Sequence, residues 1–405
     1  MLLRANTVLT LSGPPLEKAD VRVTGNRITE VGPSLTPHEG EPVHDLPGHV
    51  LLPGLINAHC HLDYTGFKGS IFPTKSFTGW IRRINALKGS FSADDYLKSI
   101  DDGFQQLMRS GCTTVFNIEA FPDLFLRMKK PPIRTWWFLE LIDIRTRLAG
   151  DDTLAGALAF FAEHKDWPGG FGLSPHSPYT ASIELFRLAK HCSQDMGMRF
   201  TTHIAESIEE QEMFLYGQGP LYDFLTELGR DTEDCGQGSA LSHLMDFGLL
   251  DEHCLAVHLN YLQEYDLKLL REHPLNIVHC PRCHAYFAHS RFPLERLRDA
   301  GCSISLGTDS LASNDMLDLR GEIRQLRKNY PNLTAEECLH MVTTAPARAI
   351  GLPGELGVIA PGAFADLIAF PLPANTNPYQ AVLFSEGPPS FFMVDGEIKN
   401  PTNSG

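Results

Sequence analysis

Two histidines separated by one residue end an apolar stretch of the chain, Leu55-Ile56-Asn57-Ala58-His59-Cys60-His61. If this stretch is a β-strand, the side chains of His59 and His61 point to one face and Cys60 points to the other. Two imidazoles on one face of a strand can bind a single metal ion from one side. Two buried structural histidines would give the same pattern, so the metal interpretation depends on ligands elsewhere in the chain.

Three further apolar stretches also end in residues that can bind a metal or transfer a proton, namely His203, His258 and Asp309. Together with His59 and His61, the residues His203 and Asp309 would supply three imidazole nitrogens and one carboxylate oxygen. This donor set suits a borderline divalent ion such as Zn²⁺. The ion would lower the pKa of a water molecule at its open position toward neutrality and make that water a nucleophile.

Such a site needs a scaffold that brings the ends of distant strands together. Helical stretches such as 93–109 and 183–198 alternate with short apolar runs through the middle of the chain. This alternation predicts parallel β-α-β units. If these units close on themselves, the chain has an α/β fold of the (β/α)8 TIM-barrel type. In such barrels the active-site residues lie at the carboxyl ends of the strands. An open, doubly wound sheet is the alternative, but no Gly-x-Gly-x-x-Gly motif leads from a strand into a helix.

The two ends of the chain differ from the middle. Short runs rich in β-forming residues occur near both ends, among them 27–31 and 391–394, and turn residues separate them. We therefore predict a small composite β-sandwich domain from residues 1–52 and 360–405, and a metal-dependent catalytic barrel over residues 53–359. Two unrelated β extensions are the alternative.

The composition limits the class of protein. The chain has 405 residues, of which 43% are hydrophobic and 20% charged, and its net charge of -15 argues against nucleic acid as a partner. No apolar segment is long enough to span a membrane, and the first residues lack the pattern of a signal peptide. The nine cysteines show no paired spacing and indicate reduced thiols, so we expect a cytoplasmic protein.

Several of these runs together resemble the amidohydrolase superfamily: Pro53–His61, His203-Ile204-Ala205-Glu206, His258, Gly307–Ser310 and Leu356–Leu367. The resemblance implies a barrel with a composite β domain. No lysine stands at a bridging position on the middle strands, so the resemblance is to the branch with one metal. That branch contains nucleoside, guanine and cytosine deaminases and triazine chlorohydrolases. The implied cofactor is one divalent transition metal, Zn²⁺ first, with Fe²⁺ and Mn²⁺ as alternatives.

The resemblance also implies a role for each matching residue. The metal ligands would be His59, His61, His203 and Asp309. His258 would orient or deprotonate the nucleophilic water, and Glu206 would protonate the ring nitrogen beside the attacked carbon. His258 and Asp309 would together supply the proton for departing ammonia. The alternative for Glu206 is a solvated carboxylate that opens a helix and is stabilised by the helix dipole.

Two loops bear on the substrate. The run 174–180 resembles a loop of adenosine-type deaminases whose histidine contacts the substrate, here His176. The run 279–287 occupies the place of a His-Cys-Pro-x-Ser-Asn motif in many relatives, with Cys283 and His284 in place of Ser and Asn. We expect His284 to contact the substrate.

The same run raises the question of a second zinc site, because Cys280 and Cys283 are three positions apart and have histidine neighbours. We expect these cysteines to be structural, since no second cysteine pair with suitable spacing accompanies them.

The segment 76–83 follows the first barrel strand and should lie over the barrel mouth. Trp80 could stack on a heterocycle and Arg82 could bind an anionic group. A helix whose aromatic residues only pack into the core is the alternative. With the run 308–314, this segment is similar to one group of aminodeoxyfutalosine deaminases of menaquinone synthesis, although Asp63 stands where we expect Glu in that group.

We therefore predict a metal-dependent deaminase that releases ammonia from an amino-substituted, purine-like ring of nucleoside type, with aminodeoxyfutalosine among the candidate substrates. The alternatives are a cyclic-amide hydrolase or a chlorohydrolase on the same scaffold, and a non-catalytic relative that only binds. The placement of Glu206 after His203 favours ring protonation and so argues against simple amide cleavage. None of the expected metal ligands is missing, which argues against a non-catalytic relative. The expected partners are a small-molecule substrate and a second copy of the chain in a homodimer, with no nucleic acid and no membrane.

Overall fold

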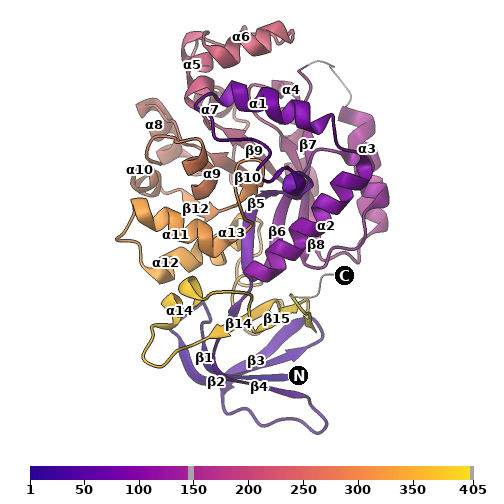
Figure 1. Cartoon of the computed structure of the whole chain (residues 1–405), viewed down its shortest axis with the longest axis vertical. Helices are drawn as coiled ribbons and strands as arrows, with labels where there is room; N and C mark the ends of the chain where they lie inside the picture. The colour runs from indigo at the N-terminus through magenta and orange to yellow at the C-terminus, as the bar shows by residue number, and fades with distance from the viewer. Residues whose placement is uncertain (145–149, 402–405) are drawn as a thin grey trace.

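Two sheets organise the chain in this computed structural model, which describes residues 1–144 and 150–401 (Figure 1). The larger sheet has nine parallel strands in the order β12-β11-β10-β9-β8-β7-β6-β5-β13. Their bounds are β5 Leu55–His61, β6 Cys112–Glu119, β7 Arg134–Leu141, β8 Gly169–Pro175, β9 Arg199–Ile204, β10 Cys254–His258, β11 Asn276–His279, β12 Ser303–Leu306 and β13 Asp309–Ser310.

The two ends of this strand order belong to one segment of the chain, and this closes the barrel. Only Gly307 and Thr308 separate β12 from β13, and β13 pairs with β5. The Gly307 N–H donates to His279 O of β11 (3.0 Å), while the Thr308 N–H donates to His59 O of β5 (3.1 Å). A Cβ at position 307 would lie 2.8 Å from His59, so this closure requires glycine.

Helices connect the barrel strands and pack around the outside, as the sequence pattern predicts for an α/β barrel (Figure 1). The helices of the first half are η1 Leu62–Phe67, α1 Phe77–Lys88, α2 Ala93–Ser110, η2 Pro122–Arg127, α3 Gly150–Glu163, α4 Ile183–Met196, α5 Ile208–Tyr216 and α6 Pro220–Glu227. Those of the second half are α7 Ala240–Asp246, α8 Glu264–Glu272, α9 Pro281–Tyr286, α10 Leu294–Asp299, α11 Leu319–Asn329, α12 Ala335–His340, α13 Thr344–Ala349 and α14 Pro378–Phe384.

The smaller sheet combines strands from both ends of the chain, as predicted. Its order is β16-β15-β14-β4-β1-β2-β3, and the bounds are β1 Leu2–Val8, β2 Leu16–Thr24, β3 Arg27–Pro33, β4 Val43–Pro53, β14 Leu367–Pro371, β15 Phe391–Val394 and β16 Glu397–Ile398. Because the long strand β4 pairs with both β1 and β14, the seven strands form one continuous mixed sheet, where the sequence suggested a sandwich. Leu3, Val21 and Met393 lie in its separate core.

In the described part of the chain, no helix combines the length and the apolar character that crossing a membrane requires.

Candidate active site

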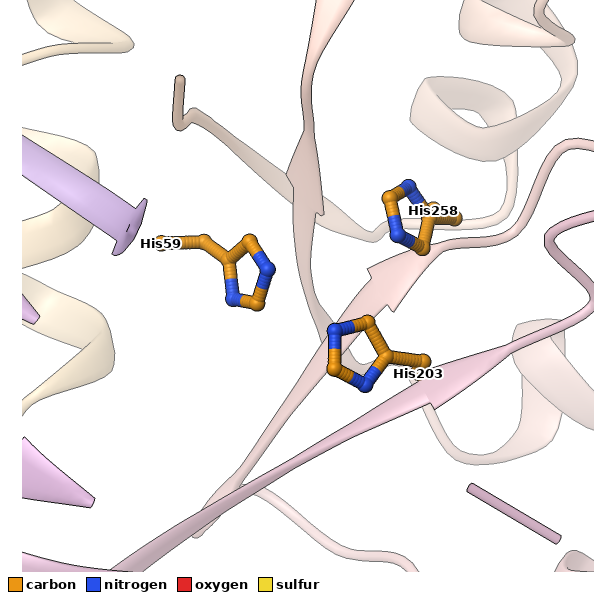
Figure 2. Close-up of side chains that lie close together, drawn as sticks. All are labelled: His59, His203 and His258. Atoms are coloured by element: carbon orange, nitrogen blue, oxygen red, sulfur yellow. The ribbon is translucent and has the colours of Figure 1, made fainter. Parts of the chain in front are cut away.

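The five residues that the sequence predicts around a metal lie at the carboxyl ends of four barrel strands. They are His59 and His61 on β5, His203 on β9, His258 on β10 and Asp309 on β13. All five are buried. Figure 2 shows His59, His203 and His258 pointing toward one another from three separate strands.

The donor atoms of these side chains converge on one small volume. His61 Nε2 lies 3.4 Å from His203 Nε2, and Asp309 Oδ1 lies 3.7 Å from His59 Nε2 and 3.9 Å from His61 Nε2. Ligand atoms lie within 4.8 Å of one another in three overlapping groups of three: His59–His61–Asp309, His59–His203–His258 and Glu206–His258–Asp309. Nitrogen and carboxylate donors at these separations can surround a single cation.

Three of these histidines, His61, His203 and His258, are in the protonation state that metal binding needs. Burial lowers the pKa of His61 and His258 well below the usual value and that of His203 to about 3, and neighbouring histidines lower these pKa values further. Each ring is therefore neutral at physiological pH and keeps a lone pair. The Nδ1–H of His203 donates to His176 O (2.8 Å), which fixes the tautomer and leaves Nε2 free to bind an ion.

Several of these buried nitrogens lack a protein partner. Among the described residues, no hydrogen-bond partner is found for either ring nitrogen of His59, for His61 Nδ1 or for His258 Nε2. Buried polar atoms are normally satisfied, so such a cluster needs a specific cause. A divalent transition ion fits these residues, because imidazole nitrogen with carboxylate oxygen is a preferred donor set of Zn²⁺.

Glu206 lies next to this cluster. Its Oε1 is 3.6 Å from His258 Nε2, and its side chain is buried. Burial raises the pKa of Glu206 well above its usual value, and the charges of Asp309 and Glu210 raise it further. A raised pKa favours the protonated carboxyl group, which is the form that can act as a proton donor.

Glu206 stands on a turn with an unusual backbone. Ala205, which precedes it, has a φ of 52°, in the left-handed region that residues with a Cβ rarely adopt. The Glu210 carboxylate accepts hydrogen bonds from the Ala205 N–H (2.9 Å) and the Glu206 N–H (2.7 Å), and Asn260 Nδ2 donates to Glu206 O (2.9 Å). These contacts hold the strained turn and hence the direction of the Glu206 side chain.

Sequence reasoning missed the contributions of Glu210 and Asn260. A signal for Glu210 was present, because Ser207-x-x-Glu210 is a capping-box pattern. Ser207 does cap α5 by accepting from the Glu210 N–H, but the Glu210 carboxylate reaches back to the turn instead of to Ser207. No comparable local pattern in the sequence indicates Asn260, because it follows β10 whereas Glu206 follows β9.

The carboxylate of Asp309 is oriented by three donors. The Ser310 N–H donates to Oδ1 (2.7 Å), while Cys283 Sγ (2.8 Å) and Ser313 Oγ (3.3 Å) donate to Oδ2. Cys283 therefore acts on the cluster through Asp309. Donors that orient a ligating carboxylate in this way typically change metal affinity when they are removed.

This contact predicts different results for two substitutions of Cys283. Cys283→Ser should leave metal content unchanged, because a hydroxyl can still donate to Asp309. Cys283→Ala removes the donor and should weaken metal binding by about 10-fold or more. Titration of metal-free protein with Zn²⁺ in the presence of a competing chelator measures both. Loss of a full metal equivalent in Cys283→Ser would mean instead that the thiol is itself a ligand.

A cavity of about 550 Å³ opens beside the cluster, with His61, His203, Glu206, His258 and Asp309 in its wall. Residues of α1 and α6 form much of the remaining wall, and most of them are apolar. This volume is typical of sites for small organic ligands, so the donor cluster faces a space that can hold a substrate.

Of the four predicted substrate contacts, the structure places His176 and Trp80 in the cavity wall. His176 Nδ1 is hydrogen bonded to Thr180 Oγ1 (2.6 Å), which sets the direction of the ring. The Trp80 ring is stacked on Phe77 at 6.1 Å and meets Phe287 edge-on at 5.3 Å.

The structure places the other two predicted contacts, Arg82 and His284, outside the cavity wall. Arg82 lies on the outer side of α1, where it pairs with Glu227 (3.1 Å) and covers the Phe224 ring. His284 Nδ1 donates to Asn260 Oδ1 (3.1 Å), behind the turn that carries Glu206. His284 therefore contacts the Glu206 turn only indirectly, through Asn260.

A profile of the Amidohydrolase family matches residues 50–399. The chain belongs to the Amidohydrolase family. The matched residues include every barrel strand and the whole donor cluster, so the resemblance seen in the sequence is confirmed, and the protein is an enzyme of this hydrolase family.

Curated relatives match over nearly the full chain. A 5-methylthioadenosine/S-adenosylhomocysteine deaminase of Pyrococcus furiosus is 28% identical over 94% of this chain and 90% of its own. A protein of the same name from Symbiobacterium thermophilum is 25% identical over 98% of this chain and 93% of its own.

Solved structures show the same fold. A zinc-bound adenosine deaminase of Xanthomonas campestris has a TM-score of 0.83 at 24% identity, and the match covers 98% of this chain and 92% of that one. The aminofutalosine deaminase of Helicobacter pylori, solved with methylthio-coformycin, also has a TM-score of 0.83 at 24% identity, covering 98% and 100% of the two chains. The barrel and the composite sheet are therefore a shared architecture.

Proposed function

We propose that the protein is a metal-dependent deaminase that removes the exocyclic amino group of a purine-like ring in a nucleoside and releases ammonia. The observation that carries this proposal is the position of Glu206, whose pKa is raised by burial, in the cavity wall and 3.6 Å from His258. Deamination of an aromatic ring needs such a proton donor beside the nucleophile. The names of the curated relatives support the same reaction.

Four residues would hold the metal ion: His59, His61, His203 and Asp309. The donor set favours Zn²⁺, with Fe²⁺ and Mn²⁺ as alternatives. When bound, such an ion lowers the pKa of water to near 7 and so supplies a nucleophile at neutral pH.

The remaining chemistry is assigned to side chains of the chain itself. His258, which burial keeps neutral, orients the nucleophilic water and accepts its proton. Glu206 gives its proton to the ring nitrogen beside the attacked carbon, which removes aromatic stabilisation where the bond forms. As the C–N bond breaks, the hydroxyl group on the attacked carbon gives its proton to Glu206 and becomes the carbonyl oxygen. His258 and Asp309 return a proton to the departing amino group, so that it leaves as ammonia. Trp80 and His176 in the cavity wall contact the base.

Ammonia release from a panel of compounds tests this proposal. The panel contains adenosine, 5'-methylthioadenosine, S-adenosylhomocysteine, aminodeoxyfutalosine, guanine and cytosine, with a cyclic amide and a chlorotriazine as controls for other reactions of the fold. We expect ammonia from at least one purine nucleoside and no reaction of the controls. Ring opening or chloride release without ammonia would contradict the deaminase and favour one of the alternative hydrolases.

The homodimer stays a prediction, and sedimentation of the purified protein measures it.

A further inference from the structure

Helix α1 forms one long wall of the cavity. It lies across the end of the barrel that is remote from the composite sheet (Figure 1). The Glu209 carboxylate of α5 fixes its first turn by accepting from the Phe77 N–H (3.0 Å) and the Thr78 N–H (2.8 Å). Its cavity-facing residues recur at intervals of three and four and so share one helical face: Phe77, Trp80, Ile81, Ile84, Asn85 and Lys88.

This face is apolar for most of its length and ends in a positive charge. About 16 Å separates Phe77 from Lys88 along the helix axis. The Lys88 ammonium lies 4.6 Å from the centre of the Tyr64 ring, and Tyr64 is stacked on His61 at 5.5 Å. The Tyr64 ring therefore lies between Lys88 and His61 of the donor cluster.

Glu140 adds a negative charge to the same cavity. On β7, Trp137 packs outward against Phe104 of α2 and Phe125 of η2. Because strand side chains alternate, Glu140 lies on the opposite, inner face, at the carboxyl end of the strand. It lines the cavity together with Lys88.

Lys88 and Glu140 do not form an ion pair with each other. Within the described ranges, 1–144 and 150–401, neither the Lys88 ammonium nor the Glu140 carboxylate has a hydrogen-bond or ion-pair partner in the protein. Both groups thus keep their hydrogen-bonding capacity for a ligand, and a bound ligand that left them unpaired would lose affinity.

We propose that Lys88 and Glu140 form a subsite for the vicinal 2'- and 3'-hydroxyl groups of a ribose, so that the enzyme takes ribonucleosides in preference to free bases and dideoxynucleosides. Two adjacent hydroxyls can donate to the two oxygens of one carboxylate and accept from an ammonium. An anionic group would suit Lys88 but meet the charge of Glu140, and an apolar group would leave both unpaired. The subsite rests on the proposed function, which places the base at the donor cluster.

Two cavity variants and a matched control test the subsite. We measure kcat/KM for adenosine and 2',3'-dideoxyadenosine in metal-loaded wild type, Glu140→Gln, Lys88→Met and Arg82→Met. Wild type should favour adenosine by roughly 10- to 100-fold, because a hydrogen bond to a charged group is lost in the dideoxy compound. This preference should fall toward one in Glu140→Gln and Lys88→Met. It should persist in Arg82→Met, which removes the same charge from the outer side of α1.

Binding of inosine and 2',3'-dideoxyinosine, measured by calorimetry, separates the subsite from the deaminase. Ammonia release with equal rates and equal binding of the two sugars would overturn the subsite and leave the deaminase intact. Tighter binding of inosine than of dideoxyinosine, without ammonia from adenosine, would support the subsite and overturn the deaminase. If both variants changed only the preference for S-adenosylhomocysteine over 5'-methylthioadenosine, the charges would serve a zwitterionic substituent and the diol subsite would be overturned.

Discussion

Replacement of Glu206 by glutamine should reduce kcat on the best substrate by about 10⁴-fold and leave metal content and melting temperature unchanged. General acid–base groups contribute on the order of 10²- to 10⁴-fold, and a residue that moves protons in both directions should lie at the upper end. Glutamine is nearly isosteric and can still hydrogen-bond, but it has no proton to give to the ring. Because the interaction develops only as the ring is protonated, the loss should appear in kcat and not in KM.

Three measurements on one protein sample decide this prediction: kcat and KM for the best substrate, metal per chain, and melting temperature. Glu212→Gln is the matched control, since Glu212 is on α5, the helix that directly follows the Glu206 turn, and does not line the cavity. If Glu206 only favoured the start of that helix, its variant would melt at a lower temperature and keep near-normal turnover. Turnover within about threefold of wild type would show that Glu206 is not the proton donor.

Much of the metal cluster could be predicted because its signals are local. The spacing of His59 and His61 on one strand fixes their common face, and the barrel pattern fixes which strand ends meet. The same barrel pattern indicates His203 and Asp309, which can bind a metal and stand at or just past the ends of short strand-like runs. The structure then brings all of these side chains to one place, with donor atoms within 4.8 Å in each group.

The substrate wall was harder to predict, because it depends on which face of a helix is turned inward. Trp80 and Arg82 were both expected at the substrate, but residues two apart on a helix do not share a face. The helical period would have separated them, and it would have pointed to Lys88, eight residues after Trp80, on the cavity side.

Other supporting residues depend on tertiary contacts that no local pattern contains. Cys283 reaches Asp309 across 26 residues, and Asn260 reaches the Glu206 backbone across 54 residues. The expectation for His284 came from its position in a family motif. Its actual partner, Asn260, was decided by the packing of α9 against the turn after β10.

Removal of a metal ligand should have a larger effect than any other single change. Wild type should contain about one transition metal per chain. His59→Ala and Asp309→Ala should contain close to none and should lose measurable turnover. His59 is only 1% exposed, and Asp309 Oδ1 lies 3.7 Å from His59 Nε2 and 3.9 Å from His61 Nε2, so each substitution removes a donor from the centre of the buried cluster.

His258→Ala separates ligands from proton-transfer groups. His258 lies within ligand distance of His59 and His203, yet the proposed mechanism uses it only to orient and deprotonate water. We therefore expect His258→Ala to keep its metal and lose turnover, whereas His59→Ala loses both. His191→Ala, at an exposed surface histidine, should change neither. A His258 variant without metal would mean that His258 belongs to the ligand set.

Chelation adds a readout that does not depend on activity. A ligand that binds only the folded state stabilises it, so a chelator should lower the melting temperature of wild type and of His258→Ala. It should leave His59→Ala and Asp309→Ala unchanged, since these proteins have no metal to lose. Full turnover of wild type after the metal has been removed, verified by elemental analysis, would exclude the metal from the reaction. The converging histidines would then be a structural feature of the barrel mouth, and Glu206 with His258 would have to act on water unaided.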